Sequence, residues 1–274
     1  MTLYVRTRGE GPSVLWIHGY TMDGSVWEAL WRLLPGWRHV GVDLPGHGRS
    51  RPLCPGTSLP ALAAELAELA RAERAALVVA ESIGSMIALQ LAIDHPDDVR
   101  GLIVGSPTIA GAPSEPGTAE RYRTLAGLAR MGVDGERLAD VWMAAPPDIF
   151  RGTEAHPELR ARLRAIVAGH SWRELRDGAM AGLSGHVHTA DDLRGIAART
   201  LVLIGEQDMP TFRAASVRLR DTVPRCRVLT VPDAGHLCMI ERPAAVAPAI
   251  AAHLSAAVPE VTAEVVPEVQ HAGS

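Results

Sequence analysis

Short apolar segments alternate with longer amphipathic segments along most of the chain. The short segments end in turn residues and predict β-strands, whereas the longer ones carry apolar residues at helical spacing. This alternation is typical of a parallel sheet flanked by helices, so we expect an α/β fold. The predicted strands are residues 13–17, 39–42, 75–80, 101–105, 200–204 and 227–231, and the predicted helices between them include 59–74 and 85–95.

The alternation stops between residues 107 and 189, where only helical patterns follow one another. The segment that leads into them, 107–117, is rich in Pro, Gly, Ala and Ser, as a surface crossing would be. The helical patterns are 120–131, 136–143, 157–169 and 172–183. We therefore predict an α/β core of residues 1–106 and 190–257, an inserted helical cap at 107–189 and a flexible tail at 258–274.

The composition excludes several classes of function. All 27 basic residues are Arg, so the chain has no Lys amine for a Schiff-base aldolase, a pyridoxal-phosphate enzyme or a Walker-type nucleotide site. The net charge of −4 disfavours nucleic acid as a partner, since phosphates need a basic face. No apolar run approaches the roughly 20 residues that span a bilayer, and the start lacks a secretion signal. We expect a cytoplasmic protein with a small-molecule substrate and no membrane partner; a homodimer is one open possibility.

The sequence VVAESIGSM at residues 78–86 indicates a strand, a sharp turn and a helix, with Ser82 at the apex. Such a turn strains the apex residue and exposes its Oγ at the start of the helix. The positions two before and two after the apex must be small, because the helix passes close to the strand. Gly84 meets this need, and Ala80 stands where Gly is usual. A serine that only caps an ordinary helix is the alternative interpretation.

Four further motifs accompany this turn. They are LWIHGY at 15–20 followed by Trp27, DLPGHGRS at 43–50, LIGEQD at 203–208 and AGH at 234–236. Together with the Ser82 turn they resemble the α/β-hydrolase family, in the family's order and over nearly the whole chain outside the predicted cap. The resemblance implies a catalytic triad in the chain order Ser, acid, His.

The resemblance assigns Ser82 as the nucleophile, Asp208 as the acid and His236 as the base. Asp208 lies just past a predicted strand, from where it would hold the imidazole tautomer of His236. Acyl transfer also needs two N–H donors aimed at the oxyanion, and we expect the backbone amides of Tyr20 and Ile83 to supply them. The alternative acids are Asp233, Asp191 and Asp192.

We expect neither a metal nor a cofactor. His186 and His188 resemble a metal-binding pair, but two residues at i and i+2 in a helical or loop segment are poorly placed to bind one metal ion. A Ser-His-Asp set with an oxyanion hole instead predicts hydrolysis of a carboxylic ester or lactone through an acyl-enzyme. The alternatives are a carbon–carbon bond hydrolase of aromatic breakdown, and a non-hydrolytic lyase, cyclase or ligand-binding member of the family.

Within the family, residues 82–90 and 130–142 are similar to 3-oxoadipate enol-lactonases, and residues 18–27 are similar to carboxylesterases such as the pimeloyl-carrier-protein methyl esterases. The cap should supply selectivity, because the core supplies the chemistry. We expect an apolar pocket for an apolar or aromatic metabolite, lined by Trp27, Trp142, Met143 and Trp172. A dianionic enol-lactone would instead need a cap arginine in the cavity, and the candidates are Arg121, Arg123 and Arg130.

Overall fold

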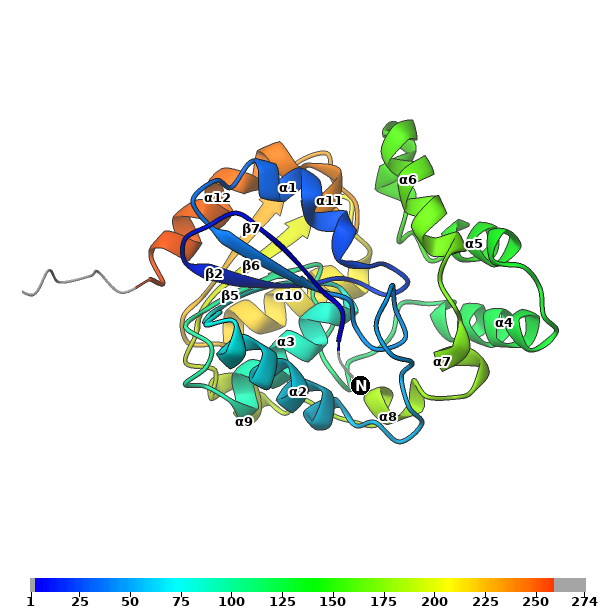
Figure 1. Ribbon diagram of the computed structural model, residues 1–274, viewed down its shortest axis with the longest axis horizontal. Coiled ribbons are helices and arrows are strands. Elements are labelled where there is room, and N and C mark those ends of the chain that lie inside the picture. Colours follow the sequence, from blue (N-terminus) through cyan, green and yellow to red (C-terminus); the bar gives the residue numbers. More distant parts are fainter. Residues whose placement is uncertain (1–2, 259–274) are drawn as a thin grey trace, which may run out of the picture.

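The computed structural model describes residues 3–258, and its centre is a seven-stranded sheet in the order β1-β3-β2-β4-β5-β6-β7 (Figure 1). Strand β1 is antiparallel to β3, and the other neighbours are parallel. The strands are β1 (Val5–Arg8), β2 (Ser13–Ile17), β3 (Arg38–Val42), β4 (Leu77–Glu81), β5 (Gly101–Gly105), β6 (Arg199–Gly205) and β7 (Cys226–Val231). The predicted α/β class is confirmed.

Helices cover both faces of the sheet. Figure 1 shows α1 (Glu28–Arg32), α11 (Cys238–Glu241) and α12 (Pro243–Ser255) on one side, and α2 (Leu59–Ala72) and α3 (Ile83–Asp94) on the other. The helices α9 (Ala190–Arg194) and α10 (Pro210–Thr222) flank β6 in the chain. Within residues 3–258, no helix is both long and apolar enough to cross a membrane.

Alternate residues of the buried strands enter two separate apolar clusters, as the twofold repeat of a strand requires. Along β2, Trp16 belongs to the cluster that contains Val246 of α12, whereas Leu15 and Ile17 belong to the cluster that contains Leu66 of α2. Such strands are buried on both faces, which explains why they are near-continuous apolar runs in the sequence.

The six predicted strands all occur, with ends that differ by no more than two residues. Strand β1 was not predicted. Its sequence VRTR lies at an edge of the sheet and is half-buried or exposed, so it lacks the apolar run that marks the inner strands.

The segment between β5 and β6 contributes helices alone among the described residues. These are α4 (Thr118–Arg130), α5 (Gly135–Met143), η2 (Arg151–Ala155), α6 (Pro157–Ala168), α7 (Arg173–Arg176) and α8 (Ala181–Ser184), followed by α9. Figure 1 shows α4 to α7 gathered at the end of the molecule opposite α12. The helix predicted over 172–183 is interrupted, because Gly178 has a positive φ of 72° between α7 and α8. The predicted tail lies, apart from Val258, outside the described residues.

Candidate active site

Ser82 occupies the sharp turn between β4 and α3. Its φ of 53° and ψ of −122° lie in a region that costs a non-glycine residue about 1–3 kcal/mol. The turn is tight because α3 passes close to β2. A Cβ on Gly84 would lie 2.5 Å from the carbonyl oxygen of His18, so a larger residue at position 84 would push the helix away from the sheet.

Asp208, His236 and Ser82 form a continuous chain of hydrogen bonds. Nδ1 of His236 lies 3.0 Å from Oδ1 of Asp208, and Nε2 lies 2.9 Å from Oγ of Ser82. The side chains of Asp208 and His236 are fully buried. With the Nδ1 proton donated to the carboxylate, Nε2 is free to accept the hydroxyl proton of Ser82.

The three residues follow β4, β6 and β7, so the parallel sheet brings them to one edge. The alternative acids lie elsewhere. The side chain of Asp233 is 73% exposed and lies 3.6 Å from the Arg242 guanidinium. Asp191 forms an ion pair with Arg194, and Asp192 caps α9.

The loop that carries His236 is held by buried groups that the sequence did not reveal. The carboxylate of Glu241 accepts hydrogen bonds from the amides of Gly235 at 2.6 Å and Leu237 at 3.1 Å, on either side of the histidine. The hydroxyl of Ser106 donates to the backbone carbonyl of His236. These contacts hold the backbone on either side of His236 and thereby position its imidazole. Nothing in the sequence indicates that these residues come together in the fold.

A second buried carboxyl, Glu81, lies directly before Ser82. Neither of its oxygens has a hydrogen-bond partner among the described residues, and Oδ2 of Asp208 has none either. Burial, followed by the charges of Asp208 and Glu241, raises the pKa of Glu81 well above its usual 4.5. The sequence did contain a signal here, because Glu81 is the one charged residue of an otherwise apolar strand.

Ser82 faces a cavity of about 240 Å³, and the two residues predicted to supply oxyanion amides also line it. Neither the Tyr20 nor the Ile83 amide donates to a backbone or side-chain acceptor within residues 3–258. The loop after β2 is braced by His18, which accepts from the Leu44 amide at 2.9 Å and lies 2.8 Å from the Gly19 carbonyl oxygen. Two unpaired amides beside Ser82 can therefore donate to a bound oxyanion.

The same loop is joined to the inserted helices. The phenol of Tyr20 donates to Glu174 of α7 at 2.6 Å, and His170 contacts the same carboxylate oxygen at 2.9 Å. The indole of Trp142 donates to the hydroxyl of Thr21 at 2.8 Å. Burial, followed by the charge of Glu174, raises the pKa of Tyr20 well above 10, so the phenol remains a donor.

The walls of the cavity are largely apolar and come from both parts of the chain. Trp142 lines it as predicted, together with Met180 and Leu183. The other lining residues are Gly19, Tyr20, Met22, Ser82, Ile83, Met86, Pro107 to Glu115, Thr118, Tyr122, Ile149, Ser184, Thr211, Phe212, Ala215 and Leu237. Phe212 also lines the cavity and was not predicted to do so. Its ring centroid lies 4.2 Å from that of His236.

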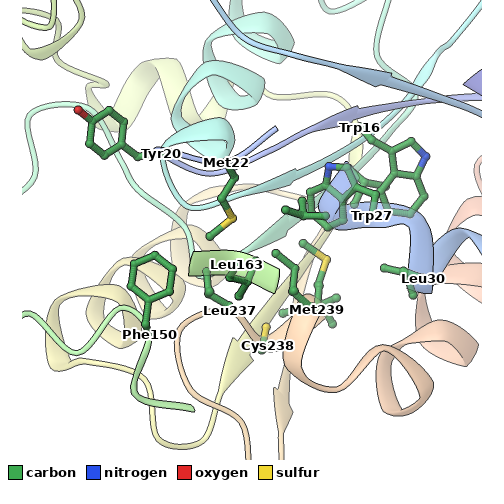
Figure 2. Packing of buried hydrophobic residues seen from close by; sticks show 14 of the residues in the cluster. Trp16, Tyr20, Met22, Trp27, Leu30, Phe150, Leu163, Leu237, Cys238 and Met239 are labelled. Atoms are coloured by element: carbon green, nitrogen blue, oxygen red, sulfur yellow. The ribbon is translucent and has the colours of Figure 1, made fainter. Parts of the chain in front are cut away.

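Three of the predicted pocket residues do not reach the cavity. Trp27 is fully buried in the core, with its ring 5.2 Å from that of Trp16; Figure 2 shows the two side by side, with Tyr20 across the cluster. Trp172 packs behind Tyr20 and His170, and Met143 is buried at the end of α5. All three side chains belong to the same buried hydrophobic cluster.

None of the predicted cap arginines lines the cavity in the described chain. Arg123 is exposed, Arg121 donates to the carbonyl oxygen of Pro146, and Arg130 donates to that of Arg176. The arrangement expected for a dianionic lactone is therefore missing from this part of the structure.

The fold and the site together define the class of protein. The chain belongs to the alpha/beta hydrolase family, whose model matches residues 14–249. It is similar to the pimeloyl-[acyl-carrier protein] methyl ester esterase of Yersinia enterocolitica, with 30% identity over 254 residues that cover 89% of this chain and 93% of the relative.

Solved structures share the architecture. A thermophilic esterase from Thermogutta terrifontis is 26% identical, with a TM-score of 0.78 and 93% of each chain covered. An enol-lactonase from Burkholderia xenovorans LB400 is 20% identical, with a TM-score of 0.77 over 92% of this chain and 96% of the other. The second likeness shows the common fold.

Proposed function

We propose that this protein hydrolyses a carboxylic ester or lactone of a small, largely apolar metabolite through an acyl-enzyme on Ser82. The observation that carries the proposal is the unbroken hydrogen-bond chain from Asp208 through His236 to Ser82, at the floor of an apolar cavity. His236 acts as the general base, and Asp208 holds its tautomer and offsets the charge that develops on the ring.

In the first half of the reaction, Oγ of Ser82 attacks the ester carbonyl and its proton passes to Nε2 of His236. The carbonyl oxygen becomes an oxyanion that receives hydrogen bonds from the amides of Tyr20 and Ile83. The tetrahedral intermediate then expels the alcohol, which takes the proton from His236. Water repeats the sequence on the acyl-enzyme, releasing the acid and restoring Ser82.

Ester hydrolysis is the class of reaction of this enzyme. The esterase relatives support it, and a lactone is an internal ester that the same acyl step opens. The carbon–carbon hydrolase and the non-hydrolytic member are less favoured, because the relatives at about 30% identity act on esters by their names. The cytoplasmic location stays a prediction from the sequence, and so does a possible homodimer.

The test compares two serines of the same cavity. Ser82→Ala should lower kcat for p-nitrophenyl butyrate by on the order of 10^3- to 10^6-fold with an unchanged circular dichroism spectrum. Ser184→Ala is the matched control, since Ser184 lines the cavity but donates to the Met180 carbonyl, and it should retain activity. Full activity in Ser82→Ala would contradict the mechanism.

A further inference from the structure

The cavity above Ser82 contains a single formally charged lining residue within the described part of the chain, and that residue is Glu115. It lies in the segment between β5 and α4, and it is half-buried. Pro113, Ser114 and Thr118 line the same cavity, whose walls are largely apolar.

The carboxylate of Glu115 is held in place by the start of α10. Its Oε2 accepts a hydrogen bond of 3.2 Å from the backbone amide of Thr211, in the first turn of that helix. The partial positive charge at a helix N-terminus favours a negatively charged group beside it. The contact also fixes the carboxylate on the wall beside Phe212, whose ring contacts that of His236.

No basic side chain of the described residues offsets the negative charge of Glu115, so an anionic substrate would meet that charge directly. Among residues 3–258, Glu115 forms no ion pair within 4.0 Å, and no arginine or histidine lines the cavity. A substrate that carries its own carboxylate would meet a like charge in a partly desolvated space without a counterion. An uncharged chain would bury apolar surface there, and a cationic group would find a partner.

We propose that Glu115 determines substrate charge in this site: the cavity takes esters or lactones whose chains are uncharged or end in a cationic group, and it rejects those that end in a carboxylate. The inference rests on the proposed function and narrows its substrate class. It excludes the dianionic lactone for which the sequence left room.

The experiment uses three matched series of p-nitrophenyl esters, whose acyl chains of increasing length end in a methyl, a carboxylate or an ammonium group. For the wild-type protein, kcat/KM should be higher for the methyl and ammonium esters than for the carboxylate esters. The carboxylate esters should be at least about tenfold poorer than methyl esters of equal length.

Glu115→Gln removes the charge but keeps an oxygen that can accept from the Thr211 amide. Relative to the methyl esters, the variant should raise kcat/KM for the carboxylate esters about tenfold and lower it for the ammonium esters. Glu120→Gln, an exposed glutamate on α4 outside the cavity lining, should leave all ratios as in the wild type.

The failures of the two proposals are distinguishable. Hydrolysis of all three series at equal rates by the wild type, or charge ratios that Glu115→Gln does not move, would overturn the role of Glu115 while leaving ester hydrolysis intact. A loss of activity on every series in Glu115→Gln would show a purely structural role and would also overturn it. No hydrolysis of any series by the wild type would contradict the proposed function itself.

Discussion

The phenol of Tyr20 donates a 2.6 Å hydrogen bond to Glu174, and this contact ties the loop beside Ser82 to the inserted helix α7. Tyr20 also lines the cavity that contains Ser82. The position of α7 is thereby coupled to the position of the loop whose Tyr20 amide we propose as an oxyanion donor.

Removing this hydroxyl should weaken catalysis more than binding. Tyr20→Phe leaves a buried carboxylate short of one donor, which costs about 1–3 kcal/mol, and frees the loop. We expect a fall in kcat of about tenfold with a smaller change in KM, and a lower thermal midpoint. Tyr122→Phe is the control, because Tyr122 lines the same cavity without contacting Glu174 through a hydrogen bond in the described residues. Unchanged kcat in Tyr20→Phe would show that the loop does not need the link.

The acid of the triad can be tested by comparing two aspartates. Asp208 contacts Nδ1 of His236 at 3.0 Å, whereas Asp233 is largely exposed on the neighbouring turn. Asp208→Asn should lower kcat on the order of 10^4-fold, since an amide favours the wrong tautomer of the imidazole. Asp233→Asn should change it less than about twofold. A larger loss in Asp233→Asn than in Asp208→Asn would show that Asp233, and not Asp208, is the acid of the triad.

Glu81 should make the folded protein less stable as the pH rises. Its pKa is raised in the folded state, so above pH 4.5 the unfolded chain loses a proton that the folded chain keeps, and unfolding is favoured progressively. The glutamine side chain of Glu81→Gln does not titrate in this pH range. The thermal midpoint of the variant should therefore gain on that of the wild type between about pH 4.5 and neutrality.

Glu120→Gln is the control for that comparison, because Glu120 lies exposed on the surface of α4. A difference between Glu81→Gln and the wild type that stays constant from acid to neutral pH would mean that Glu81 is ionised in the folded protein.

The inner strands and the Ser82 turn could be predicted because their signals are local. A strand buried on both faces must be a short apolar run. Position 84 requires glycine, because a Cβ there would lie 2.5 Å from the backbone oxygen of His18. The resemblance to the family added Asp208 and His236 through motifs that each lie next to a strand end. Strand β1 escaped prediction because an exposed edge has no such apolar run.

The pocket was harder to predict, because side-chain type does not say which surface a residue faces. Trp27, Met143 and Trp172 are as apolar as Trp142, yet only the last reaches the cavity. Groups that act through the tertiary fold were also missed. Glu174 meets Tyr20 across 154 positions, and the contact of Glu115 with Thr211 spans 96.

The central claim is that Ser82 forms the covalent acyl intermediate, and covalent labelling tests it most directly. A fluorophosphonate forms a bond between its phosphorus and an activated serine Oγ as fluoride leaves, and peptide mass spectrometry locates the adduct. We predict one adduct per chain on the peptide that contains Ser82, much slower labelling in His236→Ala and none in Ser82→Ala. An adduct on another residue, or no adduct while ester hydrolysis proceeds, would contradict the account.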